Sequence, residues 1–266
     1  MVKFLYKEAT IKKGDLNMSG HSKWSTIKHK KAKVDAQRGV AFAKYSREII
    51  VAAKLGGGDL SSNFRLRTAV EKAKAGGVPN DNIKRAIEKA TKSSDADNFF
   101  ELTYEGYGAN GVAIFIEALT DNKNRTAGDL RSYFTKYQGN LGENGCVGWM
   151  FKQYGMITFD NSLNFDEIFE HAIELGANDA YQEEDEIKVL TSPEDFQTIT
   201  EGFEKLNIKP KEASLTRISE NTIEVDDIES AKLILKLMEK IEENDDVQNV
   251  YSNFEFTDDV EKALEL

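Results

Sequence analysis

The chain of 266 residues is 40% hydrophobic and 30% charged, with a formal net charge of −11, a composition typical of a globular protein of about two domains. No apolar run reaches the roughly 18 residues of a membrane-spanning helix, and one cysteine with three histidines excludes intrachain disulfides and zinc-type ligand spacing. We therefore expect a cytoplasmic protein with no metal, no other cofactor, no small-molecule substrate and no membrane partner.

The charge is unevenly divided along the chain. Residues 1–92 carry 21 Lys and Arg against 8 Asp and Glu, whereas residues 93–266 carry 14 against 38. The basic excess is densest between residues 20 and 39. Such a stretch serves to neutralise a polyanion, although many basic runs are only solvated surface.

The first third of the chain is predicted to be helical. Residues 1–17 lack the apolar core of a secretory signal, and we treat them as an N-terminal extension of a unit that spans 18–95. Apolar residues at helical spacing predict three helices in this unit. The first runs to Leu55 and stops at the glycines 56–58, the second follows Asn63 as its N-cap, and the third follows Asn80 as its N-cap. Their apolar stripes are narrow and rich in alanine, which leaves the outer faces cationic.

From this distribution we predict a nucleic-acid interface on the basic segment and on the outer faces of the helices. Lys and Arg side chains contact phosphates, and Trp24 is available to stack on a base. The predicted contact residues are Lys23, Trp24, Lys28, His29, Lys30, Lys31, Lys33, Arg38, Lys44, Arg47, Arg65, Arg67, Lys72, Lys74, Lys84 and Arg85.

After a polar linker near residue 95, the period of the apolar residues changes from helical to alternating, and strands begin to alternate with helices. The predicted strands cover 102–108, 112–119, 145–151, 156–159, 187–190, 213–218 and 247–256. The predicted helices cover 126–137, 165–175, 193–206 and 227–243.

This order predicts an α+β fold in which the helical unit is followed by two α/β units of the ferredoxin-like, split βαβ kind. Residues 96–152 and 219–266 would complete one discontinuous unit, and residues 153–218 would form a second unit inserted into it. Two consecutive units without interleaving are the alternative.

Two polar segments invite a binding interpretation. The glycines of 106–111 are followed by a strand, whereas a phosphate loop is followed by a helix, so a hairpin turn is predicted. Residues 119–126 are predicted to start a helix, with Lys123 and Arg125 as candidate additional contacts.

Other reactive residues have structural explanations. Cys146 has no histidine near it in the sequence and is predicted to be a buried structural residue. His171 lies on an amphipathic helix, and the acidic cluster 183–186 is better explained as a solvated loop than as a cation site. Because no catalytic constellation can be argued, we do not expect an enzyme.

Five long strings of the chain are distinctive. They are GHSKWSTIKHKKAKVDAQRG (20–39), VAAKLGGGD (51–59), NFRLRTAVEKAKAGGVPNDNIKRAIEKA (63–90), YEGYGANGVAIFIEALTDNKNRT (104–126) and GNLGENGCVGWMF (139–151). In this order they resemble the YebC family (YebC/PmpR transcriptional regulators), which also contains the mitochondrial translational activator of cytochrome c oxidase. The resemblance is strong over residues 18–152 and weaker beyond.

The resemblance implies three domains with an interleaved middle one, and a regulator that binds DNA or RNA. Ala109-Asn110 and Lys123 depart from the family's usual Pro-Gly and Arg, and the loss of bidentate contact at Lys123 weakens a specific role for that loop.

We expect an RNA- or ribosome-directed factor that regulates translation, because the acidic part of the chain would be repelled from duplex DNA laid along it. A DNA-binding transcriptional regulator is the alternative. In a third hypothesis the basic end docks on an acidic partner or on the chain's own acidic units.

Overall fold

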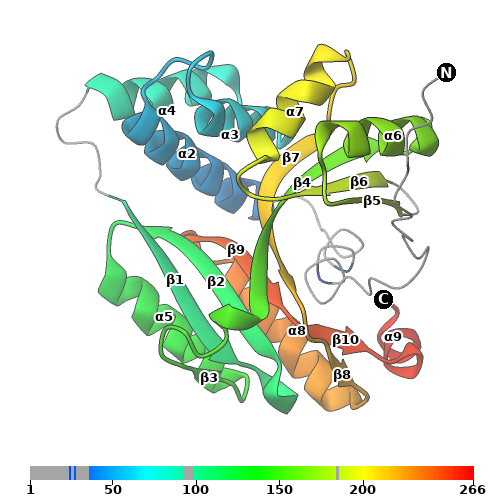
Figure 1. The fold of residues 1–266 in the computed structure, drawn as a ribbon. Helices are drawn as coiled ribbons and strands as arrows, with labels where there is room; N and C mark the ends of the chain where they lie inside the picture. The colour runs from blue at the N-terminus through cyan, green and yellow to red at the C-terminus, as the bar shows by residue number, and fades with distance from the viewer. Residues whose placement is uncertain (1–23, 25–26, 28–35, 93–98, 184–185) are drawn as a thin grey trace.

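The computed structural model describes residues 24, 27, 36–92, 99–183 and 186–266. Figure 1 shows a helical unit and two α/β units, which confirms the predicted α+β class. In the described part of the chain, no helix is long and apolar enough to cross a membrane.

The helical unit contains α2 (Ala36–Gly56), α3 (Phe64–Ala75) and α4 (Asn80–Lys92). As predicted, Asn63 caps α3, because its side-chain oxygen accepts the N–H of Leu66 at 3.0 Å. Its amide nitrogen also donates to the carbonyls of Ala52 and Gly57, both at 2.8 Å, so one buried side chain joins the end of α2 to the start of α3.

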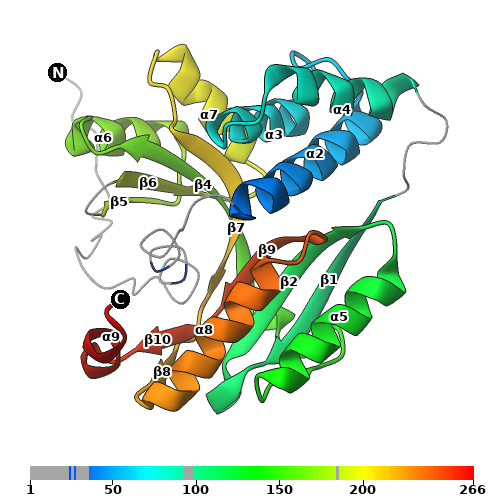
Figure 2. The same ribbon diagram turned by 180° about the vertical axis from the view of Figure 1, so that it is seen from behind.

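The lower unit in Figure 1 is an antiparallel sheet of order β3-β1-β2-β9. Its strands are β1 (Phe100–Tyr107), β2 (Ala113–Thr120), β3 (Asn140–Leu141) and β9 (Val247–Ser252). The helices α5 (Lys123–Lys136) and α8 (Ile228–Glu242) cover one face, as Figure 2 shows from behind. Ile114 and Ile116 pack in the core cluster that contains residues of these helices, and Phe115 packs in a different cluster.

The second α/β unit has an antiparallel sheet of order β5-β6-β4-β7. Its elements are β4 (Phe151–Asp160), α6 (Phe165–Leu175), β5 (Asp179–Gln182), β6 (Glu186–Thr191), α7 (Phe196–Lys205) and β7 (Glu212–Ser219). The chain passes through this whole unit before β9 returns to pair with β2. β4 and β7 are paired from Phe151–Ser219 to Thr158–Glu212 and form the long ribbon that links the two units in Figure 1.

Three short elements complete the lower unit near the C-terminus. β8 (Ile223–Val225) and β10 (Phe254–Phe256) pair in parallel, and α9 (Asp258–Leu264) follows. The sequence pattern predicted neither β8 nor α9 as a separate element, and it missed β5 in the second unit.

The strand predicted at 145–151 is wrong. Residues 148–150 form a 3₁₀ turn, η2, and β4 begins only at Phe151. The cause is Glu105 of β1, whose buried carboxylate accepts the backbone N–H groups of Gly145, Val147 and Gly148 at 2.8, 2.7 and 2.6 Å. Amides that are bound to a carboxylate cannot take part in a strand ladder.

Trp24 and Ile27 belong to the hydrophobic core of the lower unit. They are 3% and 2% exposed and lie in the cluster built from β2, α5, α8, β8, β9, β10 and α9. The structure therefore gives the Trp24 ring a packing role and does not present it to a nucleic-acid base.

Replacing Trp24 by alanine should lower the free energy of unfolding by about 3–5 kcal/mol, because a large buried ring leaves a cavity in the core. Urea unfolding followed by circular dichroism measures this loss. The matched control is Trp24→Phe, which keeps most of the ring volume and should lose much less. A loss below about 1 kcal/mol in the alanine variant would contradict the packing role.

Replacing Glu105 by alanine should cost about 3 kcal/mol or more, because the buried N–H groups of the 145–148 loop lose a charged acceptor. Hydrogen exchange should accelerate at Val147 and Gly148. Glu143→Ala removes an exposed carboxylate from the same loop and should change stability by less than about 0.5 kcal/mol. Equal effects of the two substitutions would rule out a stabilising role for the hydrogen bonds between this loop and Glu105.

Candidate nucleic-acid interface

The predicted contact residues divide into several groups in the structure. Lys23, Lys28, His29, Lys30, Lys31 and Lys33 lie outside the described residues, and Arg38 lies near the start of α2. The remaining cations are carried by α2, α3 and α4, and the structure uses them in two different ways.

The cations of α2 dock on the C-terminal end of α8. Lys44 Nζ donates to the carbonyl of Glu242 at 2.5 Å, and Arg47 donates to the carbonyl of Asp245. Arg47 also forms an ion pair with Asp246, with Nη1 and Oδ1 3.4 Å apart. The last carbonyls of a helix carry partial negative charge, and the positive side chains of Lys44 and Arg47 complement it.

Asp246 is the centre of a buried polar network. Its Oδ2 lies 2.8 Å from Arg125 Nη2, 2.8 Å from the Thr126 hydroxyl and 3.1 Å from the Thr120 hydroxyl. Burial raises the pKa of Asp246, but the hydrogen bonds from Arg125 and Thr126 and the charges of Arg47 and Arg125 outweigh it and leave this pKa below its usual value. The carboxylate is therefore ionised at neutral pH and holds two arginines.

This network changes the interpretation of segment 119–126. Arg125 is held by Asp121 and Asp246, at 2.7 and 2.8 Å. Lys123 Nζ lies over the ring of Phe100, 4.1 Å from its centroid. Both candidate cations of the segment thus have partners inside the protein.

The cations of α3 face both α/β units. Arg67 Nη2 is 2.9 Å from Glu201 of α7, and Lys72 Nζ is 3.4 Å from Glu212 of β7. Hydrogen bonds from Gln197 and Arg67 hold the pKa of Glu201 below its usual value. Arg65 bridges Glu48 of α2 and Glu101 of β1, at 2.8 Å to each.

Lys74, Lys84 and Arg85 are the other predicted contacts on α3 and α4. All three side chains are exposed, and within the described part of the chain none takes part in an ion pair. α4 lies at the edge of the molecule, with α2 between it and the lower sheet in both views (Figures 1 and 2). These three residues form what we call the free cationic face.

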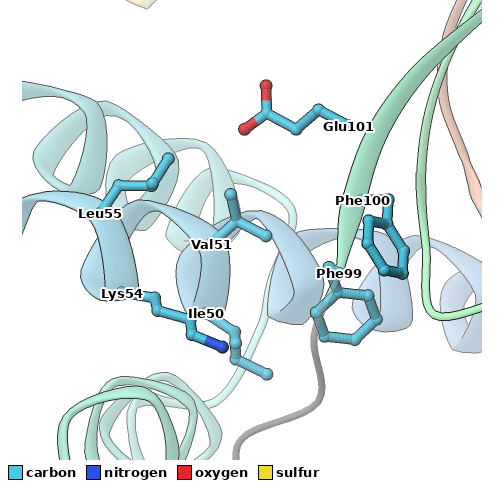
Figure 3. Close-up of a pocket in the computed structure, with 7 residues that line it drawn as sticks. All are labelled: Ile50, Val51, Lys54, Leu55, Phe99, Phe100 and Glu101. Carbon is cyan, nitrogen blue, oxygen red and sulfur yellow. The ribbon is translucent and has the colours of Figure 1, made fainter.

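A surface hollow of about 530 Å³ lies beside the interface between α2 and β1 (Figure 3). Ile50, Val51, Leu55, Phe99 and Phe100 provide apolar walls, and among the described residues Lys54 and Glu101 are the charged ones that line it. Ligand pockets usually carry several convergent polar groups, and the described lining of this hollow offers two charged side chains on apolar walls.

The other reactive residues have local partners. Burial, and then the negative charge of Glu105, raises the pKa of the Cys146 thiol, which disfavours the nucleophilic thiolate. In the acidic segment, Glu183 pairs with Lys188 and Glu186 with Lys211. Among the described residues, no cluster of His, Cys, Asp or Glu could hold a metal ion.

Sequence reasoning did not identify the acids that engage the basic helices. Asp246, Glu101, Glu201 and Glu212 are distant in the chain from their partners, and nothing in the local pattern distinguishes them from other surface acids. The only signal is the opposite charge of the two parts of the chain, which the third hypothesis used.

Comparisons with known proteins place the chain in a family. A family model described as the TACO1/YebC protein N-terminal domain matches residues 22–93, and one described as the TACO1/YebC second and third domain matches residues 99–254.

Full-length relatives agree with these matches. A "probable transcriptional regulatory protein" of Geotalea uraniireducens (strain Rf4) is 51% identical over 242 residues, which cover 91% of this chain and 98% of the relative. One of Geobacter sulfurreducens is 49% identical over 248 residues, covering 93% and 100%. The crystal structure of a conserved hypothetical protein, Aq1575, from Aquifex aeolicus matches with a TM-score of 0.80 and 44% identity, over 89% of this chain and 98% of that one. The chain therefore belongs to the TACO1/YebC family.

Proposed function

We propose that this protein is a nucleic-acid-binding regulator of gene expression that holds phosphates through its helical unit. The free cationic face carries this proposal. Residues 36–92 contain 12 Lys and Arg against 5 Asp and Glu, and Lys74, Lys84 and Arg85 remain exposed after the internal ion pairs have formed. Exposed cations on adjacent helices suit the spaced charges of a phosphate backbone.

RNA, within a ribosome or a messenger, is the partner that we favour. The body of the protein from residue 93 onward has 38 acids against 14 bases, and it lies below and beside the helical unit (Figure 1). A long straight duplex on the helices would approach this acidic body, whereas a single strand or a folded RNA edge can reach one end alone. We therefore propose a role in translation, in the cytoplasm, without catalysis.

A DNA-binding role in transcription is the second candidate, because the relatives from Geotalea and Geobacter are named probable transcriptional regulatory proteins. Crosslinking in cells followed by sequencing of the attached nucleic acid separates the two. Recovery of ribosomal or messenger RNA supports our proposal, and recovery of promoter DNA supports the alternative.

Replacing Lys74, Lys84 and Arg85 together by alanine should weaken RNA binding by roughly tenfold or more. If each contacts one phosphate of a single strand, the slope of log K against log salt should become less steep by about 2. Fluorescence anisotropy with a labelled single-stranded oligoribonucleotide, titrated at several salt concentrations, measures both quantities.

The matched control replaces Arg131, Lys209 and Lys236 by alanine, which removes the same charge from exposed positions of the α/β units. This control should bind RNA nearly as tightly as the parent protein. Equal weakening of the two triple variants would show that only net charge matters and would refute a specific cationic face.

A further inference from the structure

We infer that the face of α3 covered by the second α/β unit is the other half of the nucleic-acid interface, and that a bound RNA strand opens this contact. The inference rests on the proposed function and extends it. In the structure, Glu201 and Glu212 form ion pairs with Arg67 and Lys72, as phosphates would. The structure therefore describes a closed state, in which the protein's own acids pair with these two cations.

The α3 contact has the properties of an exchangeable interface. The side chains of Lys72 and Glu212 are 44% and 50% exposed, and those of Arg67 and Glu201 are 26% and 33% exposed. Exposed ion pairs of this kind stabilise a contact only weakly, and they weaken further in salt. The aromatic part of the contact is an edge-on pair between Phe64 and Phe196, with ring centroids 5.5 Å apart.

The contact between α2 and α8 is of a different kind. Asp246 is only 3% exposed, and it is held by Arg47, Arg125 and two threonine hydroxyls. Withdrawing Arg47 would take one of two cations from a buried carboxylate, which costs more than separating an exposed ion pair. A polyanion that competes for both contacts would therefore release α3 from the second α/β unit first and leave α2 attached to α8.

The released cations would adjoin the free cationic face. Arg67 and Lys74 are seven residues apart on α3, which is two helical turns, so they lie along one side of the helix, and Lys72 belongs to the same last turn as Lys74 on another side. An RNA strand that passes Lys84, Arg85 and Lys74 would thus continue along α3 to Arg67. Opening would add Arg67 and Lys72 to the three cations of the free cationic face that contact the RNA. RNA would then bind the open state more tightly than the closed one, and a ligand can drive a conformational change only through such a difference in affinity.

The decisive variant is Glu201→Gln/Glu212→Gln, which frees Arg67 and Lys72 and keeps the shape of both side chains. Its affinity for a labelled single-stranded oligoribonucleotide should rise about threefold to tenfold, since two exposed ion pairs no longer compete. Glu204→Gln/Glu220→Gln removes the same charge from exposed positions of α7 and the end of β7 and should change affinity less than twofold. Equal gains in both variants, or no gain in the first, would overturn the inference.

Hydrogen exchange on the parent protein gives an independent readout. RNA binding should accelerate exchange in α7 and around Phe196, because opening uncovers them, while the amides of α3 become protected. If α7 becomes protected or is unchanged while the parent protein binds RNA, the closed contact persists in the complex and the inference fails, with the proposed function intact. If neither the parent protein nor the Glu201→Gln/Glu212→Gln variant binds RNA, it is the proposed function that fails.

Discussion

The ionised carboxylate of Asp246 fixes the helical unit relative to the rest of the protein. It joins α2 through Arg47 and α5 through Arg125 and Thr126, and its own backbone follows the end of α8. Arg47 and Arg125 together compensate the charge of this buried carboxylate, so release of Arg47 would leave it with one cation in place of two. The neighbouring Lys44 adds a contact to the last turn of α8 and so fixes the direction of α2.

The basic charge of the first third therefore has two uses. Lys44, Arg47 and Arg65 attach the helical unit to the lower α/β unit, and Trp24 and Ile27 extend that attachment into its hydrophobic core. Lys74, Lys84 and Arg85 have no such use among the described residues. The hypothesis that the basic end docks on the chain's own acidic units and the hypothesis that it binds nucleic acid thus concern different side chains of the helical unit. The two hypotheses do not exclude each other.

The local sequence pattern was sufficient to predict the structure wherever hydrogen-bond partners are close in the chain or the buried face of an element is apolar. Examples are the Asn63 cap and the alternation of Ile114 and Ile116 in β2. The local pattern failed where a polar side chain that is distant in the sequence determines the conformation of a segment. Glu105 binds amides about 40 residues away and converts a predicted strand into a loop, and Lys44 meets a carbonyl 198 residues away. Trp24, an aromatic residue among cations, was predicted to be available for stacking on a base, but burial of its ring in the core outweighs the character of the adjacent residues.

The position of the free cations also restricts how a polyanion can approach. α2 is covered by α8 and β1 on one side, and α3 is covered by α7 and β7, so the side of α3 and α4 that bears Lys74, Lys84 and Arg85 offers the open approach among the described helices. The chain from residue 93 onward carries 38 Asp and Glu against 14 Lys and Arg, and this acidic excess would repel a polyanion that extends over the α/β units. A target that ends, bends or is single-stranded at the contact avoids this repulsion, whereas a continuous straight duplex does not. In the function that we propose, the acidic excess of the α/β units therefore favours a folded or single-stranded RNA over a length of duplex DNA.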